Sequence, residues 1–320
     1  MASGSKKVIY AALIGNSLVA ITKFVAATIT GSSAMFSEGV HSVVDTGNQV
    51  LLLFGLKQAQ KPADDDFPFG YGKEIYFWSF VVAILIFALG AGISIYEGVH
   101  HVLHPRPIAN PLINYIVLSL AIIFEGGALF FALKEFRHAK GSMGYLEAVH
   151  RGKDPALFVV LFEDSAAMTG LVIAFVGIAL GQITGMPVFD GIASILIGIL
   201  LGGTAIWLAI ETKGLLIGES ANKEVRLGIR GIARQVDAVN HVNEVLTMHM
   251  GPDYILVNLS VDMADNLRVG QMEKTIADLD KRIKSEFPEV KRVFVEAEER
   301  TVETGQGEST DSGKKAGETG

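Results

Sequence analysis

Apolar residues fill six long stretches in the first two thirds of the chain, and short connections with polar or turn-forming residues separate them. Each stretch has about 20 residues or more, which is the length that an α-helix needs to cross a bilayer. The pattern therefore predicts six transmembrane helices, at about 8–30, 34–56, 75–99, 112–133, 156–182 and 188–210.

The pattern changes in the last third of the chain to the shorter periods of a soluble domain. Apolar residues recur at helical spacing in two segments and alternate with polar residues in three others. This αββαβ order is typical of a small α+β sandwich. We expect a helix, two strands, a second helix and a third strand, at 222–236, 242–250, 254–263, 270–286 and 291–298.

The distribution of charge supports a division into two domains. The first 217 residues hold 13 Lys and Arg and 15 Asp and Glu, whereas the remaining 103 residues hold 14 and 19. The first part is too apolar for a soluble domain. We predict an α-helical membrane protein with a six-helix transmembrane domain over 1–217, a cytoplasmic α+β domain over 218–299 and a disordered tail over 300–320.

Composition also limits the chemistry of the chain. The net charge is −7 at pH 7, and neither part offers the basic surface that nucleic-acid binding needs. The chain contains no cysteine, which excludes disulfides, iron–sulfur clusters and thiolate zinc sites. A metal ion must therefore be bound by His, by carboxylates, or by amide and backbone oxygens. We expect no prosthetic group and no nucleic-acid partner.

Cations in the predicted loops indicate the orientation. Lys and Arg gather in the loops of one side, and Arg106 alone lies on the other. The positive-inside rule then places both termini in the cytoplasm, which an even number of spans permits. Because the loops are short and no presequence is visible, we expect an integral protein of a bacterial inner (cell) membrane.

Ionisable residues inside the predicted spans are the strongest functional signal, because a charge within a bilayer is costly and usually faces a partner or a water-filled cavity. His41 and Asp45 lie four residues apart in the second span, so they share one helix face and can bind one divalent ion together. The fifth span holds Glu163 and Asp164, and the fourth holds Glu125. A structural contact between helices is the alternative for each of them.

Two further charged residues have structural interpretations. Lys23 lies in the first span, and we expect its ammonium to extend to the outer membrane interface. Asp190 begins the sixth span, where a carboxylate favours a helix N-terminus.

Three motifs follow one another in an order that makes their combination specific. The second span reads Ser37-Glu-Gly-Val-His-Ser-Val-Val-Asp-Thr-Gly-Asn-Gln49, Phe69-Gly-Tyr-Gly-Lys73 precedes the third span, and Leu215-Leu-Ile-Gly-Glu219 follows the sixth. With these motifs the chain resembles, over about 8–299, the cation diffusion facilitator (CDF) family of divalent-metal/proton antiporters. The second span and the Glu163-Asp164 pair are most similar to the zinc-transporter-9-like branch.

The resemblance implies a transport site between spans two and five, with two ligands from each helix. His41 and Asp45 match the first pair, and Asp164 matches the second ligand of span five. The first ligand of span five falls at Val160, which cannot coordinate a metal. The fourth ligand is then water, Glu163 or Glu125.

The donor set favours Zn²⁺, because one imidazole with two or three carboxylates suits tetrahedral coordination, while Mn²⁺, Co²⁺ and Fe²⁺ also fit oxygen-rich ligands. Protons compete with the metal for these groups, so a pH gradient can drive export by alternating access. We therefore expect a proton-coupled metal exporter and not an enzyme. A non-transporting membrane metal sensor or scaffold and a passive cation channel are the alternatives.

The family resemblance also implies metal sites outside the membrane. Asp64 matches a ligand in the loop between spans two and three, but the expected histidine positions hold Phe67 and Tyr71. We expect a solvated loop there, and a C-terminal domain that forms a homodimer through apolar contacts beside the lipid bilayer. The positions in that domain that match zinc ligands contain no histidine: Asn243, Asn258, Glu273, Glu296 and Glu298.

Overall fold

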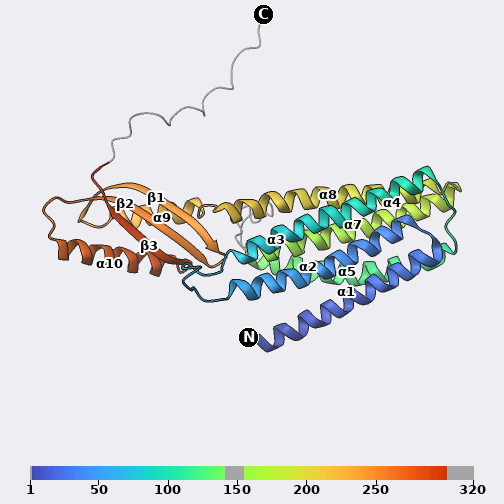
Figure 1. Cartoon of the computed structure of the whole chain (residues 1–320), viewed down its shortest axis with the longest axis horizontal. Coiled ribbons are helices and arrows are strands. Elements are labelled where there is room, and N and C mark those ends of the chain that lie inside the picture. Colours follow the sequence, from blue (N-terminus) through green and yellow to red (C-terminus); the bar gives the residue numbers. More distant parts are fainter. Residues whose placement is uncertain (1, 141–154, 301–320) are drawn as a thin grey trace, which may run out of the picture. The chain divides into compact units, whose positions relative to one another are not determined.

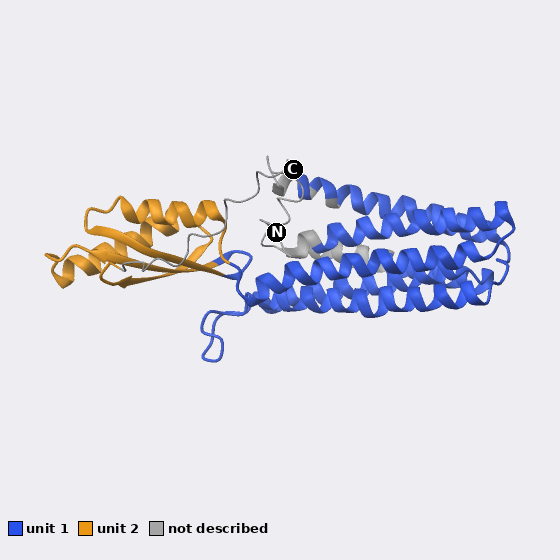
Figure 2. Cartoon of the chain, turned by 90° about the horizontal axis from the view of Figure 1, so that it is seen from above, with its two compact units in different colours: residues 1–219, 249–254 blue, residues 220–248, 255–320 orange. Residues whose placement is uncertain are grey.

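The computed structural model describes residues 2–140 and 155–300 of the chain. The chain divides into two compact units, residues 1–219 with 249–254, and residues 220–248 with 255–320 (Figure 2). The tail predicted to be disordered lies outside the described residues, apart from Arg300.

The first unit is a bundle of long helices that run side by side (Figure 1). All six predicted apolar stretches are helical, and the third is one continuous helix in which a π-helical turn, η1, joins α3 to α4. The helices are α1 (Ala2–Thr30), α2 (Ser33–Ala59), α3 (Glu74–Leu85), η1 (Ile86–Ala91), α4 (Gly92–Leu103), α5 (Pro111–Lys140), α7 (Pro155–Thr184) and α8 (Val188–Ile217).

Four of the described helical segments are long and apolar enough to cross a membrane. The apolar part of α1 that can be assessed, Asn16–Thr30, is shorter. The helix α2 is long enough, but the polar and charged residues in its middle lower its hydropathy. The helical class is therefore confirmed, whereas the number of six spans stays a prediction. The four segments are Glu74–Leu103, Pro111–Phe131, Val159–Thr184 and Val188–Ile217.

Small residues allow close packing inside the bundle, as is common between membrane helices. The helices α4 and α8 meet at Gly98, Gly191 and Gly198, where an added Cβ would collide with backbone atoms of the facing helix. Large apolar side chains such as Phe130 and Phe131 are exposed on the outside of the bundle, as expected of a surface that faces lipid.

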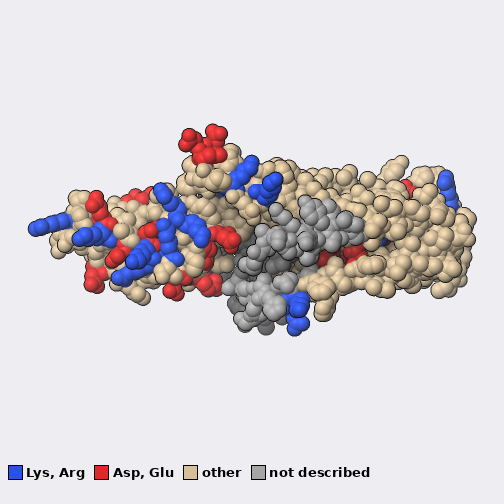
Figure 3. Space-filling view, turned by 90° about the horizontal axis from the view of Figure 1, so that it is seen from below, with Lys and Arg blue, Asp and Glu red and all other residues tan. Residues whose placement is uncertain are grey.

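The second unit packs two helices against a three-stranded sheet of order β1-β2-β3. The strands β2 and β3 are parallel, with Val257 opposite Val293. Charged side chains crowd the surface of this unit on the face shown in Figure 3, whereas they are sparse over the helices of the bundle. The predicted αββαβ order is confirmed by α9 (Lys223–Arg234), β1 (Val239–Gly251), β2 (Tyr254–Met263), α10 (Val269–Glu286) and β3 (Val290–Ala297).

Candidate metal-transport site

The two predicted ligands of the second span lie on one face of α2. They are one helical turn apart, and His41 Nδ1 lies 3.3 Å from Asp45 Oδ1. The His41 side chain is 2% exposed, and neither ring nitrogen forms a hydrogen bond with any described residue. Buried polar atoms are nearly always paired. An imidazole without such a partner inside the bundle is therefore available to a ligand.

The helix α7 brings both of its acids to the same region. Glu163 is buried, and its Oε1 accepts a 2.7 Å hydrogen bond from Asn48 Nδ2 of α2. Asp164 is partly buried and interacts electrostatically with Glu125 of α5. The carboxylate of Asp45 interacts electrostatically with all three of these acids. The five residues singled out from the sequence therefore belong to one electrostatically connected cluster.

The cluster is not an assembled coordination shell. Among the side chains that the structure describes, no three from His, Asp or Glu stand close enough to share one metal ion. Val160, at the position of the missing fourth ligand, is a half-buried side chain that packs against the apolar core.

The interpretation of Lys23 as a residue of the membrane interface is wrong. Its side chain is 0% exposed, and its Nζ lies 3.1 Å from Glu38 Oε2 and donates a 2.8 Å hydrogen bond to Ser42 Oγ. These groups take the place of water, so the ammonium stays inside the bundle. Glu38 was not predicted to take part, although an acid within an apolar helix, one turn before the His41–Asp45 pair, is a visible signal.

The end of α2 that follows Gly31 is bound to α8 through Asp190. The hydroxyl of Ser32 donates to Asp190 Oδ1 over 2.6 Å, and the backbone N–H groups of Ser33 and Ala34 donate to Oδ2 over 2.5 and 3.4 Å. These contacts supply partners for first-turn N–H groups of α2. Asp190 is therefore structural as expected, but it caps α2 instead of the helix that it begins.

A cavity of about 220 Å³ lies at the same end of the bundle. The rings of His100 and His104 are 5.0 Å apart, and Nε2 of His101 lies 3.8 Å from Asp190 Oδ2. Arg106 also lines the cavity and repels divalent cations. Glu97 lines the cavity as well, so its lining combines three histidines with one cation and one acid.

In the acidic loop between α2 and α3, the acid that matches a family metal ligand is Asp64, and it accepts hydrogen bonds from within the loop. The hydroxyl of Tyr71 donates a 2.7 Å hydrogen bond to Asp64 Oδ2, and the N–H of Phe67 donates a 2.8 Å bond to Oδ1. These hydrogen bonds lower the pKa of Asp64 and raise the pKa of Tyr71 to about 12. The two residues at the expected histidine positions thus bind the carboxylate themselves.

Four of the five family-matched positions of the second unit, all except Glu273 on α10, take part in hydrogen bonds within the sheet or at its edge. Asn258 Nδ2 donates to Glu296 Oε1 over 3.0 Å, Asn243 Nδ2 donates to Ser260 Oγ over 3.1 Å, and Ser260 Oγ donates to Glu298 Oε2 over 2.7 Å. Amide and hydroxyl groups here satisfy the carboxylates directly.

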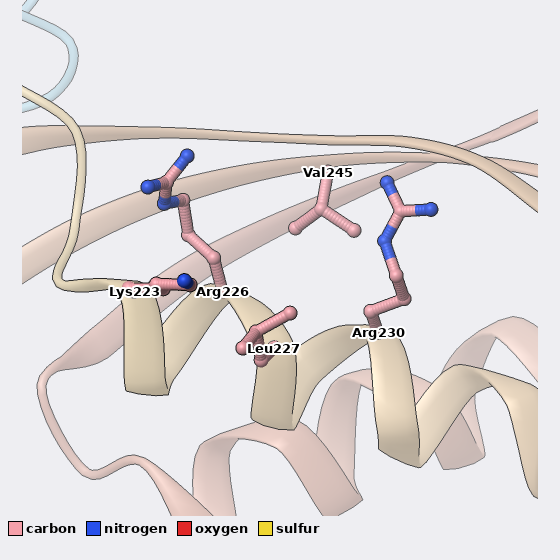
Figure 4. Close-up of a pocket in the computed structure, with 5 residues that line it drawn as sticks. All are labelled: Lys223, Arg226, Leu227, Arg230 and Val245. Carbon is pink, nitrogen blue, oxygen red and sulfur yellow. The ribbon is translucent and has the colours of Figure 1, made fainter. Parts of the chain in front are cut away.

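A cavity of about 310 Å³ lies between α9 and β1. Figure 4 shows the guanidinium groups of Arg226 and Arg230 rising from α9 on either side of Val245, with Lys223 beside them. Three cations around one cavity disfavour a metal ion there.

A comparison with models of protein families decides the family. Residues 9–217 match the cation efflux transmembrane domain. The chain belongs to the cation efflux family. The match includes every residue of the candidate site, and the resemblance to CDF proteins is confirmed.

The names of two of the following three relatives describe metal transport. The chain is 34% identical to the mitochondrial proton-coupled zinc antiporter SLC30A9 of Homo sapiens, over 81% of this chain and 46% of that protein. It is 32% identical to metal tolerance protein C4 of Arabidopsis thaliana, over 81% and 57% of the two chains. Identity to the manganese efflux system protein MneP of Bacillus subtilis is 23%, over 91% and 95%. The chain spans about half the length of the first two relatives.

These relatives correct the predicted location. The proteins at 34% identity are named as mitochondrial, which overturns the prediction of a bacterial inner membrane. That prediction rested on short loops and on the visible start of the sequence, and neither feature identifies a particular membrane. The cytoplasm as the compartment of both termini, which was inferred from the positive-inside rule, is withdrawn together with the bacterial membrane.

Proposed function

We propose that this chain exchanges a divalent transition metal, with Zn²⁺ as first choice, for protons across a membrane by alternating access. The observation that carries the proposal is the buried His41–Asp45 pair, whose imidazole lacks a hydrogen-bond partner among the described residues and whose carboxylate interacts electrostatically with the acids of α7. Membership in the cation efflux family and the antiporter names of relatives at 34% identity support it.

The ligands in this proposal come from two helices. His41 and Asp45 of α2 and Asp164 of α7 supply three donors, and Glu163 or Glu125 supplies a fourth. Metal binding draws these side chains together, and it requires that the imidazole and the carboxylates give up their protons. Protons that return to the same groups displace the metal, and this competition couples the two fluxes.

The remaining architecture in this proposal follows the family. The helices α1 and α2 complete six spans together with the four apolar segments, and the second unit joins two copies into a homodimer through apolar contacts. The exposed apolar surface of the bundle supports contact with lipid. No enzymatic step is proposed, because the relatives are named as transporters.

Metal flux into proteoliposomes under an imposed pH gradient tests the proposal, with Zn²⁺, Mn²⁺, Co²⁺ and Fe²⁺ compared. We expect gradient-driven flux that is lost in Asp45→Ala and retained in Asp65→Ala, which removes an exposed loop carboxylate as a matched control. Metal binding without flux would instead indicate a sensor or scaffold. Flux that ignores the pH gradient would indicate a channel.

A further inference from the structure

Lys23 is a fully buried cation next to the candidate site. It lies seven residues before the end of α1, which is about 10 Å along the helix axis. An ammonium has three hydrogen-bond donors. Glu38 and Ser42 of α2 accept two of them, over 3.1 and 2.8 Å. One donor is left for a further partner.

Glu125 of α5 is that further partner. Its Oε1 lies 3.9 Å from Lys23 Nζ, which is beyond hydrogen-bond distance but within the range of an ion pair. The same carboxylate interacts electrostatically with Asp164 and Asp45, two of the proposed metal ligands. Glu125 therefore interacts both with the buried ammonium of Lys23 and with two of the proposed metal ligands.

The position of Lys23 is fixed by its other contacts. Glu38 Oε2 binds the ammonium, while Oε1 lies against Gly170 of α7, where an added Cβ would collide with it. A buried ion pair gains little stability over apolar residues of the same volume. The pair is nevertheless buried beside the polar cluster of the bundle. This position favours an effect of the pair on the electrostatics of the site over a role in stabilising the fold.

We propose that Lys23 sets the metal affinity of the site by competing with the transported ion for Glu125. This inference rests on the proposed function. While the ammonium attracts Glu125, the carboxylate is withheld from the metal, and the site binds through His41, Asp45 and the acids of α7 alone. The competition weakens binding and allows the ion to leave.

Metal titration of the full-length protein in detergent, with Zn²⁺ and Mn²⁺ alone as probes, tests the inference. Lys23→Met releases Glu125 from the ammonium, and the additional carboxylate at the site is expected to tighten binding by about ten-fold. The gain is expected to be much smaller in Lys23→Met/Glu125→Gln relative to Glu125→Gln alone, and what remains measures the direct repulsion between the ammonium and the metal ion. Lys57→Met removes an exposed cation from the same bundle and is expected to leave the affinity unchanged.

Lys23→Met leaves Glu38 without its cation, so that variant can fail to fold. The double variant Lys23→Met/Glu38→Gln removes both charges, keeps Glu125 free, and is expected to show the same tightening. Unchanged affinity in the folded variants, or an equal gain in the Glu125→Gln background, overturns the inference.

Flux measurements separate this inference from the proposed function. If no variant transports metal under a pH gradient, but Lys23→Met still tightens binding through Glu125, then transport is refuted and the role of Lys23 stands. If the wild-type protein transports metal, but Lys23→Met leaves the affinity unchanged, then only the role of Lys23 is overturned. If no variant binds metal, both are overturned.

Discussion

The first turn of α2 and its middle use buried polar groups in opposite ways. In the first turn, one carboxylate of Asp190 accepts hydrogen bonds from Ser32, Ser33 and Ala34, so the acid and its donors satisfy one another. In the middle, His41 has no hydrogen-bond partner among the described residues, although it is just as deeply buried. Both regions lie on the same helix, less than three turns apart.

The presence or absence of hydrogen-bond partners distinguishes buried polar groups with a structural role from groups that can bind a ligand. A buried network that is fully satisfied makes its surroundings rigid, whereas a group left open carries a desolvation cost that a ligand can relieve. The first turn of α2 is therefore fixed to α8 by Asp190, while the imidazole of His41 in its middle remains free to bind. Alternating access needs both properties, a fixed attachment and a site whose ligands can move.

Asp45→Ala removes a carboxylate of the candidate metal site in the middle of α2. Of the variants proposed here, it is expected to have the largest effect. We expect metal flux to fall by roughly 100-fold or more, since loss of a group that only orients a ligand already costs about 10–100-fold. Thermal unfolding in detergent is expected to stay unchanged or shift upward, because a buried carboxylate is removed. Normal flux in this variant would refute the proposed site.

Asp190→Ala tests the structural role of the carboxylate that binds the first turn of α2. It leaves the Ser32 hydroxyl and two backbone N–H groups without their acceptor, which is expected to cost about 2–3 kcal/mol of stability. Chemical unfolding of the purified protein measures this loss, and metal titration of the folded protein is expected to be unchanged. A variant that stays as stable as the wild type would contradict the capping role.

Sequence patterns predicted the elements and the five candidate ligands, because both depend on local signals. Apolar periodicity locates a helix, and an acid within an apolar run is visible without a structure. The roles of Lys23 and Asp190 could not be predicted in this way. Each depends on which helix lies opposite, and that is set by packing contacts such as those at Gly170 and Gly198, not by spacing along the chain.

Asn48→Ala removes a hydrogen bond from Glu163 and tests whether that bond restricts the carboxylate. Asn48 holds Glu163 through a 2.7 Å hydrogen bond, so the variant frees the carboxylate to move. We expect metal affinity to change by up to about 10-fold, as for other residues that orient a ligand. The double variant Asn48→Ala/Glu163→Gln should bind metal like Glu163→Gln alone. Additive effects would show that Asn48 acts on another group.

Val160→His has the smallest expected effect and tests whether the middle of α2 faces a site with room for one more ligand. Val160 packs half-buried against the core of the bundle, one turn before Asp164 on α7, so a histidine there can reach the same metal ion. A fourth protein ligand is expected to tighten Zn²⁺ binding by a few-fold and to favour Zn²⁺ over Mn²⁺, because imidazole suits zinc better than manganese.

Val172→His, at an exposed position on the same helix, is the matched control and should change neither affinity nor selectivity. If the two variants behave alike in titrations with both metals, Val160 faces away from the ion, and the fourth ligand must be sought at Glu163 or Glu125.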